Sequence, residues 1–183
     1  QANTGDLGVA LHMLGNHGPS YYRRYPPAFE RFAPVCRNDD LGQCTREEIV
    51  NAYDNALLYT DHVLASLINQ LRGRAGSVDS ALVYVSDHGE SLGEKGLFLH
   101  GMPYAIAPAE QTRVPMVMWL SDGLRASAAL DAECLRRRAA KPAAHDHLFH
   151  TLLGLLGVTT SLYEPAWDLM HDCHLPALAQ GSR

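Results

Sequence analysis

The sequence lacks any long hydrophobic run. No stretch reaches the roughly 18 consecutive apolar residues that a membrane-spanning helix needs, so none is predicted in these 183 residues. The first residues, Gln1 to Asp6, also lack the basic region and apolar region of a signal peptide. Because the chain does not begin with methionine, we expect it to be a piece of a longer protein.

Positive charge is also in short supply. The sequence contains 15 Lys and Arg residues and 20 Asp and Glu residues, which gives a net charge of −5 with histidine neutral. This balance argues against nucleic acid as the main partner. With 46% hydrophobic and 19% charged residues, the composition is that of an ordinary globular chain, and its length suits one domain.

Cysteine is scarce, but two of the four cysteines, Cys36 and Cys44, lie close together in a polar stretch. A disulfide closing so short a loop would stabilise the fold by roughly 2.5 kcal/mol and would indicate an oxidising compartment. Free thiols or zinc ligands are the alternatives, although paired zinc ligands usually lie closer in sequence. Cys134 and Cys173 could form a second bridge that holds the C-terminal tail.

Several common catalytic motifs are absent. Neither Ser86 nor Ser91 lies in a G-x-S-x-G elbow, and there is no P-loop or dinucleotide-binding glycine motif. No pair of carboxylates is spaced for glycoside hydrolysis. The sequence therefore contains no evident nucleophile.

The pattern of apolar residues predicts an α/β fold. The run Ala81–Val85 is typical of a strand buried on both faces, as in a parallel sheet, and residues 7–14 and 114–120 also suit strands. A capping box at Thr45 and Glu48 opens a helix that ends at Gly73. A second helix is predicted over residues 145–157. A helix that leads into a strand fits βαβ order.

The chemistry concentrates where the strand Ala81–Val85 ends, at Asp87 and His88. A carboxylate and an imidazole in a tight turn suit Zn²⁺, with Mn²⁺ also possible, although zinc requires about four ligands. His17 and His100, each flanked by glycine, could supply further ligands or contact a substrate. The alternatives are that Asp87 caps the following turn with His88 packed beside it, and that the other two are surface histidines.

Several longer motifs together resemble one enzyme family. They are Gly15-Asn-His-Gly-Pro-Ser-Tyr-Tyr-Arg-Arg-Tyr-Pro-Pro27, Cys36 to Cys44-Thr, Tyr53-Asp-Asn-Ala, Ser86-Asp-His-Gly-Glu-Ser-Leu-Gly-Glu94, Leu99-His-Gly-Met-Pro-Tyr-Ala-Ile-Ala-Pro108 and Val114-Pro-Met. In this order they resemble the catalytic domain of bacterial lipid A phosphoethanolamine transferases, including the mobile colistin-resistance enzymes. That family belongs to the alkaline phosphatase and sulfatase superfamily. The similarity covers nearly the whole chain and weakens past Asp122.

The resemblance implies a sulfatase-like α/β sheet sandwiched by helices, in the periplasmic domain of an inner-membrane enzyme. It implies zinc-dependent transfer of phosphoethanolamine from phosphatidylethanolamine, through a threonine nucleophile, to a lipid A phosphate, which gives polymyxin and colistin resistance. Asp87 and His88 correspond to ligands of the catalytic zinc. His17 and His100 correspond to histidines that bind the phosphate or a second zinc. The Cys36–Cys44 pair corresponds to a family disulfide.

Several parts of the family pattern have no counterpart here. Membrane helices, an acidic zinc ligand and the threonine nucleophile precede this region in the family, so residues 1–183 are predicted to be the C-terminal portion of a single catalytic domain. Alone, the chain is expected neither to complete the zinc site nor to transfer anything. Met13-Leu14 also stands where the family more often has polar residues. The alternatives are a sulfatase or phosphoglycerol transferase of the same superfamily, or a non-catalytic metal-binding fragment.

Overall fold

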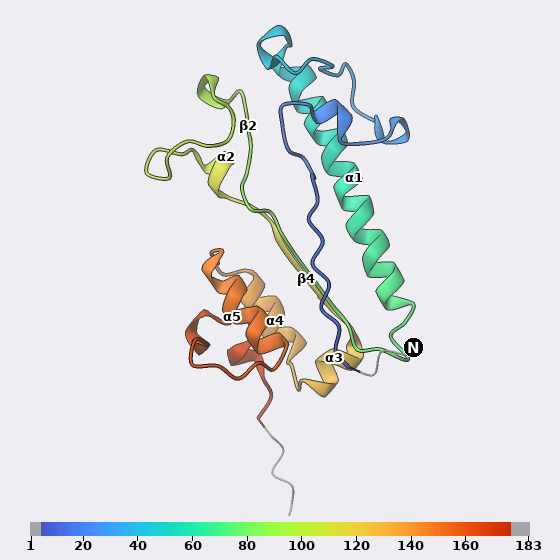
Figure 1. Cartoon of the computed structure of the whole chain (residues 1–183), viewed down its shortest axis with the longest axis vertical. Helices are drawn as coiled ribbons and strands as arrows, with labels where there is room; N and C mark the ends of the chain where they lie inside the picture. Colours follow the sequence, from blue (N-terminus) through green and yellow to red (C-terminus); the bar gives the residue numbers. More distant parts are fainter. Residues whose placement is uncertain (1–4, 177–183) are drawn as a thin grey trace, which may run out of the picture. The chain divides into compact units, whose positions relative to one another are not determined.

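The structure, a computed structural model, describes residues 5–176 and divides into two compact units (Figure 1). The first unit comprises residues 5–67 and 88–114 of the described chain, and the second comprises residues 68–87 and 115–176.

The long helix α1, Arg46–Arg72, contributes most of its length to the first unit. Its start is the predicted capping box: the Thr45 amide donates to Glu48 Oε2 at 2.7 Å, and the Glu48 amide donates to Thr45 Oγ1 at 3.3 Å. The helix ends immediately before Gly73, as predicted. Its buried residues in this unit are Ile49, Ala52, Asn55, Ala56 and Thr60.

The core of the first unit forms where α1 meets the preceding loops. It contains Tyr21, Cys36, Leu41, Ile49 and Ala52. The predicted Cys36–Cys44 disulfide is present and closes the loop just before α1. After the chain returns from the second unit, it forms the short hairpin of β2 (Ser91–Leu92) and β3 (Phe98–Leu99), followed by α2 (Ala109–Thr112).

The strand predicted over residues 7–14 is not formed. Within the described chain these residues pair with no other strand, and the side chains of Leu7, Val9 and Leu11 are 65–73% exposed. Alternating apolar residues provide a face to bury, but a strand also requires the backbone of a neighbouring strand.

The second unit contains the main β-ladder, between β1 (Ala81–Val85) and β4 (Met116–Leu120). The strands are antiparallel, with Val83 opposite Met118, so the parallel pairing predicted for β1 is wrong in the described chain. The error has a physical cause. An apolar run indicates that a strand is shielded from water, but whether the strand pairs parallel or antiparallel depends on which segment lies next to it.

Three helices follow β4 in the second unit: α3 (Asp122–Ser127), α4 (Ala132–Ala139) and α5 (Asp146–Leu155). Ser121 caps α3, and its hydroxyl also accepts the Ser80 amide at 3.0 Å. The Cys134–Cys173 disulfide joins α4 to the tail. The tail is therefore packed as far as His174, as predicted. No helix within residues 5–176 combines the length and the hydropathy that crossing a membrane demands.

Candidate histidine site

Three loops of the first unit bring His17, His88 and His100 together. One ring nitrogen from each lies within 4.8 Å of those from the other two. The rings of His88 and His100 stack with centroids 3.7 Å apart, and His17 meets them edge-on at 5.7 and 5.0 Å. His17 is exposed and the other two are half-buried, so an approaching ligand can reach the cluster.

The loop that carries His17 is attached to α1 by the residue before it. The Asn16 side chain donates to the Tyr53 carbonyl at 3.1 Å and accepts the Thr60 hydroxyl at 3.0 Å. On the other side, Arg24 Nε donates to the His17 carbonyl oxygen at 2.9 Å. These contacts fix the backbone of His17 while leaving its ring exposed.

The loop that carries His88 depends on the glycine that follows it. The Gly89 amide donates to the Gln111 carbonyl at 2.9 Å. A Cβ at this position would overlap the backbone oxygen of Glu110. Only glycine permits this close approach of two backbones, which explains its place directly after the histidine.

All three histidines use the same ring nitrogen for a protein contact. His17 Nδ1 lies 2.7 Å from the Gly18 carbonyl oxygen, His88 Nδ1 lies 2.9 Å from that of Gly89, and His100 Nδ1 lies 2.7 Å from Glu90 Oε1. Because carbonyl and carboxylate oxygens are acceptors, each contact assigns the hydrogen to Nδ1. In a neutral ring of this tautomer the lone pair lies on Nε2, which is then the atom suited to bind a metal ion.

This donor set fits zinc. Metal-binding histidines typically donate their second ring N–H to a carbonyl or carboxylate, as all three do here. Three imidazoles are fewer than the four ligands that zinc prefers. In the protonated state, the same Nε2 atoms would instead donate to the oxygens of a phosphate.

The structure thus brings together three of the four residues predicted from the sequence. Asp87, the fourth, directly precedes His88 in the chain and is the last residue of its segment in the second unit. The cluster within the first unit consists of histidines.

The sequence-based prediction missed Glu90, the carboxylate beside His100. Its position two residues after His88 could have indicated that it lies near the site. Nothing in the sequence indicates that its side chain turns inward. Tyr21 lies beside the same group. Burial, and then the negative charge of Glu90, raise the pKa of the Tyr21 phenol well above its ordinary value. Tyr21 therefore remains neutral and serves as core.

Within residues 5–176, the cluster is separate from two pockets. One, of about 280 Å³, belongs to the first unit and is lined in part by Met13, Leu14, Arg23 and Arg24. Met13 and Leu14 are the residues expected from the sequence to depart from the family pattern.

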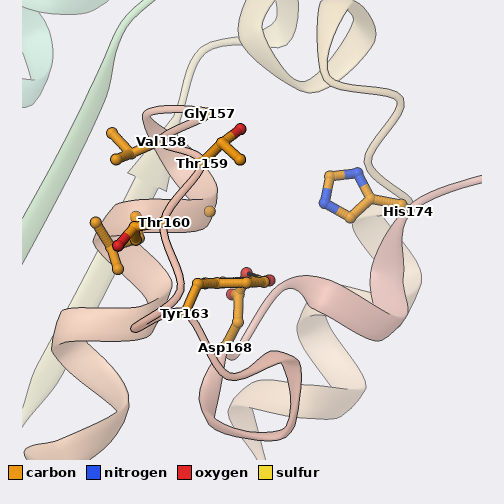
Figure 2. A pocket seen from close by; sticks show the side chains of 9 residues that line it. Gly157, Val158, Thr159, Thr160, Tyr163, Asp168 and His174 are labelled. Atoms are coloured by element: carbon orange, nitrogen blue, oxygen red, sulfur yellow. Dashed lines mark hydrogen bonds between the residues drawn. The ribbon is translucent and has the colours of Figure 1, made fainter.

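The other pocket, of about 310 Å³, lies in the second unit beside the end of α5 (Figure 2). Its buried carboxylate, Asp168, accepts the Tyr163 hydroxyl at 2.7 Å and the Met170 amide at 2.8 Å. Because both oxygens already accept internal donors, this carboxylate mainly holds the surrounding loop together.

Comparisons with known proteins agree on a single family. The Sulfatase family model matches residues 3–158. Phosphoethanolamine transferase EptA of Escherichia coli K12 is 47% identical over 170 residues, which cover 92% of this chain and 31% of that protein. Phosphatidylethanolamine transferase Mcr-1 of Escherichia coli is 50% identical over 119 residues, covering 64% of this chain and 22% of that protein.

A solved structure gives the same result for the fold. The soluble domain of lipooligosaccharide phosphoethanolamine transferase A from Neisseria meningitidis matches with a TM-score of 0.87 at 44% identity, over 91% of this chain and 50% of that one. The sulfatase-like α/β fold and the resemblance seen in the motifs are thereby confirmed. The chain spans about a third of the length of the EptA relatives it matches. It belongs to the Sulfatase family, and within that family it is similar to the phosphoethanolamine transferases.

Proposed function

We propose that residues 1–183 are the C-terminal portion of the periplasmic catalytic domain of an inner-membrane enzyme. That enzyme transfers phosphoethanolamine from phosphatidylethanolamine to a lipid A phosphate and so protects the cell against polymyxin. The observation that carries the proposal is the cluster of three histidines, each with Nδ1 in contact with an oxygen of the chain. Its residues lie in the motifs that resemble this family, and named relatives of this kind are 45–50% identical.

The residues divide into two roles. Asp87 and His88 would hold a catalytic zinc ion together with ligands from the rest of the protein. When bound, zinc withdraws charge from phosphoryl oxygens and activates a nucleophile. His17 and His100 would hold the phosphate of the transferred group through Nε2–H, or would bind a second zinc. The exposure of His17 leaves that side of the cluster accessible to a substrate.

The test uses the full-length protein in polymyxin-sensitive bacteria, with lipid A analysed by mass spectrometry. We expect the wild type to add phosphoethanolamine, and His17→Ala and His100→Ala to abolish the addition and the protection. The matched control is His62→Ala, which changes an exposed histidine of α1 outside the cluster. Full protection with both cluster histidines replaced would contradict their assignment.

The same experiment separates the alternatives. A wild-type protein that leaves lipid A unmodified but cleaves sulfate esters or transfers phosphoglycerol would be another member of the superfamily. A protein that binds zinc and modifies no substrate would be a non-catalytic metal binder.

A further inference from the structure

Glu90 is a buried carboxylate that contacts two of the three histidine loops. Its side chain is 4% exposed. One oxygen, Oε1, lies 2.7 Å from His100 Nδ1, and the other, Oε2, accepts the Gly18 amide at 2.9 Å. No lysine or arginine of residues 5–176 forms an ion pair with it. A buried carboxylate carries a large desolvation cost, so its partners must satisfy it.

The two contacts act on different loops. Through His100, Glu90 fixes an imidazole ring, because an ionised carboxylate can only accept and so places the hydrogen on Nδ1. Through Gly18, it fixes a peptide unit whose carbonyl oxygen in turn contacts His17 Nδ1. Glu90 itself follows His88 by two residues. A single side chain therefore connects the loops of all three histidines.

The packing around Gly18 leaves no room for a side chain at this position. A Cβ at Gly18 would lie 2.6 Å from Leu99 Cδ2 and 2.6 Å from the Tyr21 hydroxyl oxygen. Tyr21 is 1% exposed and belongs to the core. Gly18 therefore approaches Tyr21 and Leu99 more closely than a residue with a side chain could.

We propose that Glu90 is a positioning residue: it holds His100 with Nδ1 protonated and Nε2 free for a ligand, and it holds the His17 loop through the Gly18 amide. What the cluster binds rests on the proposed function above. The positioning itself does not, because it is a property of the chain without ligand.

The first test reads the tautomer of His100 directly, by long-range ¹H–¹⁵N correlation spectra of the ¹⁵N-labelled chain. The wild type is expected to show Nδ1 protonated and Nε2 unprotonated. In Glu90→Ala the preference should disappear, and exchange of the Gly18 amide hydrogen should become about tenfold faster or more, since a buried donor loses its acceptor. Glu110→Gln, which changes an exposed carboxylate, should leave both signals as in the wild type.

Either of two results would overturn the proposal: a neutral wild-type His100 ring protonated on Nε2 and not on Nδ1, or a folded Glu90→Ala variant with unchanged tautomer and unchanged Gly18 exchange. The first requires no variant, so the proposal stays testable if Glu90→Ala does not fold.

A second readout connects Glu90 with the proposed function. In the full-length protein, Glu90→Gln should lower zinc affinity or phosphoethanolamine transfer by about 10- to 100-fold, as expected for loss of an outer hydrogen-bond partner of a ligand. If the wild type neither binds zinc nor transfers phosphoethanolamine, the proposed function fails, and the tautomer of His100 still decides the role of Glu90. Unchanged zinc affinity and unchanged transfer in Glu90→Gln, with an active wild type, would contradict the positioning role.

Discussion

The imidazole rings of His88 and His100 stack in the first unit, with centroids 3.7 Å apart and planes inclined by 27°. Each ring donates from Nδ1 to an oxygen of the chain, so the two rings have the same tautomer. His17 meets both rings at 74°. The three loops therefore bring their histidine rings together in one small region. Zinc binding tests this arrangement.

Zinc should bind the isolated chain weakly. Three histidine nitrogens leave the ion short of its preferred four ligands, so we expect the chain to lose zinc on dialysis against a weak chelator. In direct titration, His88→Ala should lower the remaining affinity by about tenfold or more. His62→Ala should leave it unchanged. About one zinc retained per wild-type chain after dialysis would show that a complete site exists within these residues.

Asn55 should be among the most sensitive positions of α1. Its side chain is fully buried, accepts the amides of Arg31 and Phe32 at 2.7 and 2.9 Å, and donates to the Phe32 carbonyl at 2.9 Å. Asn55→Ala would remove all three of these hydrogen bonds from a buried position, at a cost of about 3 kcal/mol. Urea unfolding measures this loss.

The control for that measurement lies one turn earlier on α1. Asn51 makes one exposed hydrogen bond, to the Pro34 carbonyl, and Asn51→Ala should cost about 1 kcal/mol or less. Equal losses for the two variants would argue against the importance of burial at Asn55.

The two disulfides should contribute unequally to stability. Cys36–Cys44 closes a loop with a sequence separation of 8, and Cys134–Cys173 closes one of 39. Chain entropy then predicts losses of about 2.5 and about 4 kcal/mol when each pair is replaced by alanine. Unfolding of the two double variants, compared with the wild type, checks the order. A larger loss for the shorter loop would show that loop length does not govern their effect.

Tyr163 should make stability depend on alkaline pH. Burial, then the hydrogen bond to Asp168 and the charge of that carboxylate, raise the pKa of Tyr163 to about 12. The folded state therefore retains this proton above the unfolded pKa of about 10. The stabilisation is fully present below about pH 10 and is lost as the pH rises toward 12.

Tyr163→Phe supplies the comparison for that titration. The difference between wild-type and variant tyrosinate absorbance should place the midpoint of Tyr163 near pH 12, and the variant should lose stability less steeply between pH 10 and 12. A midpoint near the ordinary value of about 10 would show that Asp168 does not hold the neutral phenol.

Local features of the fold were predictable because their causes are local. The capping box at Thr45 and Glu48 and the glycine after Arg72 fix where α1 begins and ends, and both signals act within a few residues. The Cys36–Cys44 bridge follows in the same way from a short separation in a polar loop. Such features need no knowledge of distant segments.

Pairing between segments was not predictable in this way. The apolar runs at residues 7–14 and at β1 look alike in sequence, yet the first pairs with no strand of the described chain and the second pairs antiparallel with β4. A strand forms only when a second strand supplies hydrogen-bond partners for its backbone, and that second strand can lie far away in the sequence.

The amino-acid sequence by itself determined which residues are candidates for the site, among them His17, His88 and His100, through their glycine-flanked motifs. Only the tertiary structure decided that these three rings meet, that each uses Nδ1 internally, and that Glu90 turns inward to hold two of the loops. The physical reason is that residue type sets which bonds a side chain can form, whereas packing decides which partners, up to 72 residues apart, come within reach.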